Sequence, residues 1–265
     1  MLKLLTVVAL ALTLSPSAQS QTVKNHSDVL EGDFTPQKAM ELLFGDSNPE
    51  NIADWRPVSV PKEFNEFRDT SLRVSVLLDA AYVESGIPKH LLVTAAQPTE
   101  EGQYDCHACQ TLIGAAVFSK TNRGWVAAKR GLYLAALGEF GKPPTASLQQ
   151  LGKDRFGFVL RENHTGSGMG EWVHVFGYSK GKIQKLFSAR VESYFDFGSC
   201  EHASLATAWE QCEEFDGDFS VVPGNNPDYF DLVLTRDVTE SGSRLIRRGK
   251  HTLRFAFVGD RYRQR

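Results

Sequence analysis

From Leu72 onward the spacing of apolar residues shifts toward a period of two. Leu72, Val74, Val76 and Leu78 recur with a period of two, which is typical of a strand with one buried face. Regularly spaced strands joined by tight turns favour a mainly β fold of antiparallel sheets, arranged as a sandwich, a barrel or a propeller-like meander. Further apolar runs predict strands at 90–95, 112–118, 125–129, 155–160, 172–178, 183–189, 218–222, 229–235 and 252–258.

A short segment near the N-terminus has the period of a helix instead. Thr35 suits the N-cap and Pro36 suits the first helical position, and the apolar residues within 39–44 recur at helical spacing. Gly45 is placed to end this helix. A second stretch with helical character, 203–211, lies late in the chain.

These patterns divide the chain into two parts after its first 20 residues. Residues 21–67 form an N-terminal helix and loop segment, and residues 68–265 form a β-rich domain. Glycine and proline are concentrated near 138–147, which predicts a boundary inside that domain. The chain is long enough to bury a sizeable core.

Residues 1–20 have the pattern of a cleaved signal peptide. Lys3 supplies a positive charge, an apolar run follows as far as Leu14, and small residues precede Gln21. The run is shorter than the roughly 20 residues that a membrane-spanning helix needs. We therefore expect a periplasmic or secreted protein with no membrane span.

The overall charge argues against a nucleic-acid partner. The formal net charge is -3 and the pI is near 6.2, whereas nucleic-acid-binding domains carry strong basic patches. The basic residues near the C-terminus, such as Arg248, Lys250 and Arg254, fit a solvated strand face.

The four cysteines fall into two local pairs, Cys106 with Cys109 and Cys200 with Cys212. In an oxidising compartment, cysteines more often form disulfides than remain thiolates. Local pairing is the simplest connectivity. In the chain-entropy model the shorter loop contributes about 2 kcal/mol and the longer one about 3 kcal/mol. We interpret all four cysteines as structural cross-links.

The segment Cys106-His107-Ala108-Cys109 also has the spacing of a redox centre. Such a pair usually opens a helix, whose N-terminus lowers the pKa of the first thiol. The following residues, 112–118, are predicted to form a strand, and the sequence lacks the β-α-β pattern of a thioredoxin-like protein. Redox activity is therefore an alternative to the structural interpretation.

A metal site is the third interpretation of this segment. Cys106, His107 and Cys109 are soft ligands that suit copper(I) or zinc. Adjacent residues on a strand point to opposite faces, so Cys106 and His107 converge only at a tight turn. The sequence has no second pair with metal-ligand spacing, and we assign no cofactor.

Several short segments also occur in a familiar combination. They are Cys106-His107-Ala108-Cys109, Leu112-Ile113-Gly114-Ala115, Thr165-Gly166-Ser167-Gly168, Val221-Val222-Pro223-Gly224 and the run from Pro227 to Val233. The combination resembles uncharacterised secreted bacterial β-rich proteins that carry a Cys-His-x-Cys motif. The resemblance implies an exported, β-rich protein and brings no activity with it.

No recognisable motif assembles a nucleophile, a base and an orienting group, so we assign no catalytic residue. His164 and His174 flank one predicted hairpin, and we expect them to form a hydrogen-bonded pair at the surface. The sequence favours a non-catalytic binding or structural protein, whose partner is a protein or a small molecule. The alternative is thiol–disulfide exchange or copper or zinc handling by Cys106, His107 and Cys109.

The cross-link interpretation predicts that Cys200→Ala lowers stability. Loss of a native bridge from an exported domain should reduce the free energy of unfolding by about 3 kcal/mol. Urea unfolding of natively exported protein measures this change. An unchanged unfolding midpoint would contradict the Cys200–Cys212 bridge.

Overall fold

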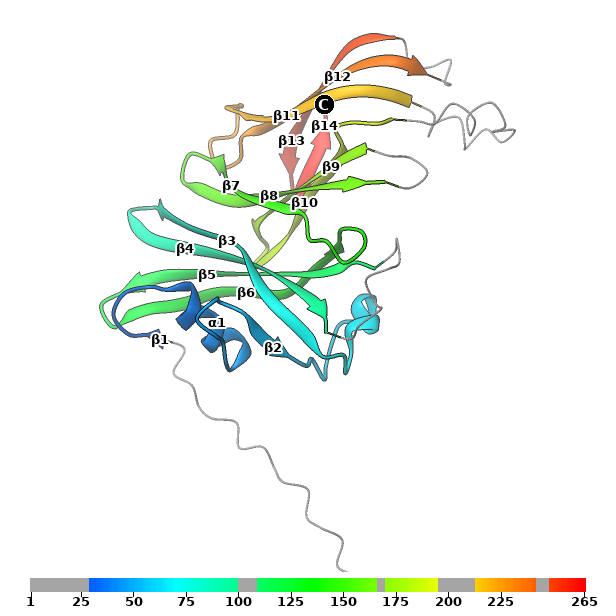
Figure 1. Ribbon diagram of the computed structural model, residues 1–265. Helices are drawn as coiled ribbons and strands as arrows, with labels where there is room; N and C mark the ends of the chain where they lie inside the picture. Colours follow the sequence, from blue (N-terminus) through cyan, green and yellow to red (C-terminus); the bar gives the residue numbers. More distant parts are fainter. Residues whose placement is uncertain (1–28, 100–108, 166–169, 195–212, 242–247) are drawn as a thin grey trace, which may run out of the picture.

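A computed structural model describes residues 29–99, 109–165, 170–194, 213–241 and 248–265 (Figure 1). Within these ranges the chain forms 14 strands, one α-helix and one 3-10 helix, and the strands pair antiparallel in three sheets. The mainly β, antiparallel fold predicted from the sequence is confirmed. No helix in the described ranges is long and apolar enough to cross a bilayer.

The first sheet has six strands in the order β1-β6-β5-β4-β3-β2. From β2 to β6 each strand pairs with the next along the chain. The short strand β1 pairs with the other side of β6 and forms one edge of the sheet. The bounds are β1 Val29–Leu30, β2 Ala53–Trp55, β3 Leu72–Glu84, β4 Ile87–Pro98, β5 Thr111–Thr121 and β6 Gly124–Leu137.

The second and third sheets are four-stranded meanders, ordered β10-β9-β8-β7 and β11-β12-β13-β14. The second contains β7 Thr145–Gly152, β8 Arg155–His164, β9 Gly170–Ser179 and β10 Lys182–Arg190. The third contains β11 Glu213–Val222, β12 Asp231–Ser241, β13 Gly249–Val258 and β14 Arg261–Gln264.

The helices cover the outer face of the first sheet (Figure 1). Helix α1 spans Pro36–Phe44, with the Thr35 side chain accepting a hydrogen bond from the Lys38 N–H at 3.3 Å. Gly45 ends the helix in the left-handed conformation, at φ 96°, which glycine adopts without steric cost. The predicted N-cap and C-terminal glycine are thereby confirmed. The 3-10 helix η1 spans Lys62–Phe67.

The three sheets stack in layers, and the second lies between the other two (Figure 1). Phe158 and Leu160 of β8 pack toward the first sheet, whereas Val159 packs in the core shared with the third. Alternate side chains therefore enter two different cores. The middle parts of β8 and β9 are therefore buried on both faces.

Three further sequence predictions concern the boundary at 138–147, the signal peptide and the helical stretch 203–211. Residues 132–137, which precede the boundary, form the end of β6. The predicted boundary at 138–147 contains the connection by which the chain passes from the first sheet into the second. The predicted signal peptide and the helical stretch 203–211 lie outside the described residues.

Trp125 supports the core beneath the helical layer. It is 8% exposed, and its ring meets that of Phe34 edge-on at a centroid distance of 5.6 Å. Phe118, fully buried, belongs to the same cluster.

We predict that Trp125→Ala lowers the free energy of unfolding by about 3–5 kcal/mol, because the truncation leaves a large cavity. Urea unfolding measures the loss. Trp125→Phe should lose less, because it keeps an aromatic ring in the cluster, and the half-exposed Val258 provides a control in Val258→Ala. Equal effects of Trp125→Ala and Val258→Ala would contradict this role.

Candidate functional site

The predicted cysteine site lies mostly outside the described residues. Cys106, His107, Cys200 and Cys212 all fall there, so the cross-link, redox and metal interpretations stay predictions. Cys109 is described, and its carbonyl accepts a hydrogen bond from the Gly141 N–H at 2.7 Å. Among the described residues, no three or more His, Cys, Asp or Glu side chains are grouped as metal ligands.

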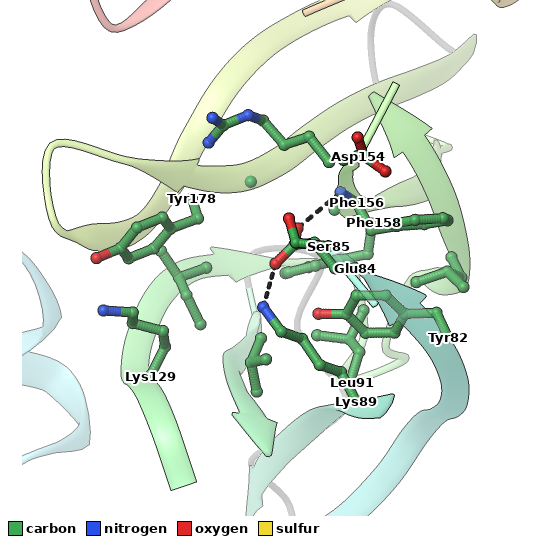
Figure 2. Close-up of a pocket in the computed structure, with 16 residues that line it drawn as sticks. Tyr82, Glu84, Ser85, Lys89, Leu91, Lys129, Asp154, Phe156, Phe158 and Tyr178 are labelled. Atoms are coloured by element: carbon green, nitrogen blue, oxygen red, sulfur yellow. Dashed lines mark hydrogen bonds and ion pairs between the residues drawn. The ribbon is translucent and has the colours of Figure 1, made fainter. Parts of the chain in front are cut away.

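The structure instead contains a pocket of about 270 Å³ between the first and second sheets, which we call the inter-sheet pocket (Figure 2). It lies near the β3–β4 and β7–β8 turns, and its apolar lining comes from both sheets. The first sheet supplies Leu91 and Val117, and the second supplies Leu148, Phe158 and Ile183. The pocket is thus a gap in the core that the two sheets share.

The ends of two hairpins, β3–β4 and β7–β8, lie beside this pocket. Ser85 and Gly86 form the β3–β4 turn with positive φ values of 52° and 77°, the combination of a tight type I′ hairpin. The Tyr82 and Phe156 rings lie 4.8 Å apart between centroids, and the Phe156 N–H donates to Glu84 Oε1 at 3.4 Å. These contacts join the two sheets at the pocket.

The pocket has three cationic side chains, and two of them are engaged within the protein. Lys89 forms an ion pair with Glu84. The Arg155 guanidinium lies 4.7 Å from the ring centroid of Tyr229 and donates to its hydroxyl. The third, Lys129, has its Nζ 4.4 Å from the centroid of Tyr178, and no described carboxylate lies within ion-pair distance of it.

Tyr82 contributes a hydroxyl to the pocket lining. Burial, reinforced by the nearby charge of Glu84, raises the pKa of Tyr82 well above its usual value, because the charged phenolate loses its hydration. The group therefore stays a neutral phenol that can donate a hydrogen bond. Figure 2 shows Tyr82 and Lys89 on one side of the pocket and Lys129 with Tyr178 on the other.

A second polar cluster lies at the opposite end of β8, roughly 20 Å along the strand from Phe156 at 3.3 Å per residue. We call it the histidine–glutamate network. It contains Glu139, Glu162, His164, His174 and Ser188. Glu162 and His164 share the face of β8 that carries Phe158 and Leu160, since alternate residues of a strand point the same way.

Glu162 is the centre of this network. Its Oε1 lies 2.7 Å from His174 Nε2 and 3.1 Å from His164 Nε2, and its Oε2 accepts from the Gly138 N–H at 2.6 Å. An ionised carboxylate only accepts hydrogen bonds, so both histidine Nε2 atoms carry protons. The two sheets are thereby joined, because Gly138 follows the last strand of the first sheet.

The two histidines have different second partners. His164 Nδ1 lies 2.9 Å from Glu139 Oε1, so the His164 ring bridges two carboxylates. His174 Nδ1 lies 2.8 Å from Ser188 Oγ. With a proton on Nε2, His174 donates to Glu162, and an unprotonated Nδ1 would accept from the Ser188 hydroxyl.

The network holds its carboxylates in the charged form. Burial alone would raise the pKa of Glu162, but hydrogen bonds from His174 and the Gly138 N–H outweigh it and lower the pKa to about 2. Burial likewise opposes ionisation of Glu139, and bonds from Thr165 and His164 lower its pKa.

The expected surface pair of histidines is wrong in two respects. His174 is 4% exposed, and the two histidines meet through Glu162, with His174 directly opposite Ser188 in the register of β9 and β10. The sequence signal for this arrangement was Glu162 itself, a charged residue two positions before His164 on a strand with two buried faces.

We predict that Glu162 contributes a pH-dependent part of stability. Its pKa falls from 4.5 to about 2 on folding, so the contribution is present above pH 4.5 and is lost as the pH falls toward 2. Glu162→Gln should remove that part of the pH dependence, as measured by urea unfolding between pH 2 and pH 7.

The exposed Glu63 provides the matched control. Glu63→Gln should keep the wild-type dependence of stability on pH. Parallel curves for Glu162→Gln and wild type would contradict the role assigned to Glu162.

No protein-family model matches the chain. No curated protein and no solved structure matches it either. The resemblance to secreted Cys-His-x-Cys proteins therefore stays a prediction from the sequence.

Proposed function

We propose that the protein binds a small amphipathic molecule with an anionic group in the inter-sheet pocket. Ligand sites in proteins are typically concave and mostly apolar, with a few polar groups that fix orientation. This pocket has an apolar lining from two sheets, and Tyr82 and Lys129 add polar groups at its edge. Its volume of about 270 Å³ suits a small molecule rather than a peptide.

The observation that carries this proposal is the charge of Lys129. Lys89 is neutralised by Glu84, whereas Lys129 contacts only the face of Tyr178 among the interactions described. An ammonium beside an apolar pocket attracts a carboxylate or a similar anion, and partial exclusion of water strengthens the interaction. A ligand would place its apolar part against Leu91, Val117 and Ile183.

We infer the setting of this binding from the sequence. The signal-peptide pattern of residues 1–20 supports a periplasmic or secreted protein. Export also supports the two disulfides, which would stabilise the fold without contributing to the pocket. No observation in the described residues favours the redox or metal alternative.

The proposal predicts that octanoate binds more tightly than 1-octanol, because the two differ in charge at one end. Isothermal titration calorimetry of the purified full chain measures both. Lys129→Ala should weaken octanoate binding about tenfold, equivalent to about 1.4 kcal/mol, and should leave binding of 1-octanol little changed.

Two variants separate the pocket from general surface charge. Lys62→Ala removes an exposed lysine on η1 and should leave both affinities unchanged. Val117→Trp fills the pocket and should abolish binding of both molecules. Equal effects of Lys129→Ala and Lys62→Ala, or undiminished binding by Val117→Trp, would refute the proposed site.

A further inference from the structure

A hydroxyl, an imidazole and a carboxylate lie in hydrogen-bonded series in the second sheet. Ser188 Oγ lies 2.8 Å from His174 Nδ1, and His174 Nε2 lies 2.7 Å from Glu162 Oε1. The three residues come from adjacent strands, β10, β9 and β8. Such a series is recognised by its geometry and not by the order of its residues along the chain.

We propose that Ser188 is an activated nucleophile that hydrolyses small carboxylic esters, with His174 as general base and Glu162 as the residue that positions His174. This activity goes beyond the proposed ligand binding and rests on different residues. It is independent of the inter-sheet pocket, which lies at the other end of β8.

The exposure of the three groups follows the order that the chemistry requires. The side chains of Glu162 and His174 are each 5% exposed, whereas Ser188 is exposed to solvent. The carboxylate and the base are thereby shielded from water, and the attacking hydroxyl is accessible.

The Glu162 carboxylate, an acceptor, selects the tautomer in which His174 is a base. Glu162 only accepts, so the His174 proton stays on Nε2 and the lone pair of Nδ1 faces the Ser188 hydroxyl. In most triads serine meets Nε2 and the carboxylate meets Nδ1. Exchange of the two nitrogens preserves the chemistry, because one nitrogen still accepts the proton while the other stays bonded to the carboxylate.

The surroundings of Ser188 provide positive charge. Arg190 follows Ser188 by two residues, on the same face of β10, and its guanidinium lies 5.3 Å from the ring centroid of Trp172. The Arg190 guanidinium also donates to Ser193 Oγ at 3.0 Å, and its positive charge would favour the negative oxygen that develops on a carbonyl attacked by Ser188.

The reaction consists of two balanced steps. Ser188 Oγ forms a bond to the ester carbonyl carbon while its proton passes to His174 Nδ1, and the ester C–O bond breaks to release an alcohol that takes that proton. Water then attacks the acylated Ser188, again giving a proton to His174. The carboxylic acid leaves as the proton returns to Ser188 Oγ.

A fluorophosphonate probe tests the nucleophile directly, since it bonds to an activated serine hydroxyl with loss of fluoride. Labelling of the wild-type chain followed by peptide mass spectrometry should place the probe on Ser188. Ser188→Ala should abolish labelling and should reduce hydrolysis of p-nitrophenyl acetate to the rate of an unrelated protein at equal concentration.

Ser147 provides a matched control, because it is an exposed strand serine with no described imidazole partner. Ser147→Ala should be labelled and should hydrolyse the ester as the wild type does. Glu162→Gln should lower the rate of Ser188 labelling by at least about tenfold, and circular dichroism should show that the fold is retained.

Three results would overturn the inference. They are an unlabelled wild-type chain, a probe attached to a residue other than Ser188, and equal ester hydrolysis by Ser188→Ala and Ser147→Ala. If Glu162→Gln unfolds, the position of the probe on the wild-type chain, found by peptide mass spectrometry, still tests the role of Ser188. None of these results bears on octanoate binding, so failure here leaves the proposed ligand site unaffected.

Discussion

The constraint on which this structure depends is the burial of the second sheet on both faces. Its strands pack against the first sheet with one set of side chains and against the third sheet with the other. A polar side chain on such a strand loses its hydration, so it must find partners inside the protein. Glu162 satisfies this requirement through His164, His174 and the Gly138 N–H.

This constraint also relates the pocket to the network. Both lie on the face of β8 directed at the first sheet, one at each end of the apolar cluster around Phe158 and Leu160. The centre of the interface is closed by apolar packing, and both ends contain charged groups. A single sheet interface thus provides two chemically different environments in a chain with few helices.

Much of the fold was predictable because its signals are local. The N-cap at Thr35, the glycine at position 45 and the alternation beginning at Leu72 each depend on residues a few positions apart. The predicted strands 112–118 and 125–129 likewise contain Phe118 and Trp125, which are buried in one cluster.

The candidate site could not be predicted in the same way, because it depends on register and stacking. His174 meets Ser188 only because β9 and β10 pair in one particular register, and a shift of one residue would turn each side chain to the other face. The inter-sheet pocket requires two hairpins more than 60 residues apart, at Ser85 and Asp154, to lie together. Neither relation leaves a periodic pattern in the sequence.

The meander order of the strands has a consequence for the entropy of closing the chain into sheets. Within the described strands, most pairings join neighbours through short turns, and closing a short loop restricts the chain little. The pairing of β1 with β6 is different, because Val29 lies opposite Val126 and encloses nearly all of the first sheet. Most of the loss of conformational entropy on closing this sheet therefore belongs to the pairing of a strand of only two residues. The packing of α1 and nearby aromatic side chains must stabilise that pairing.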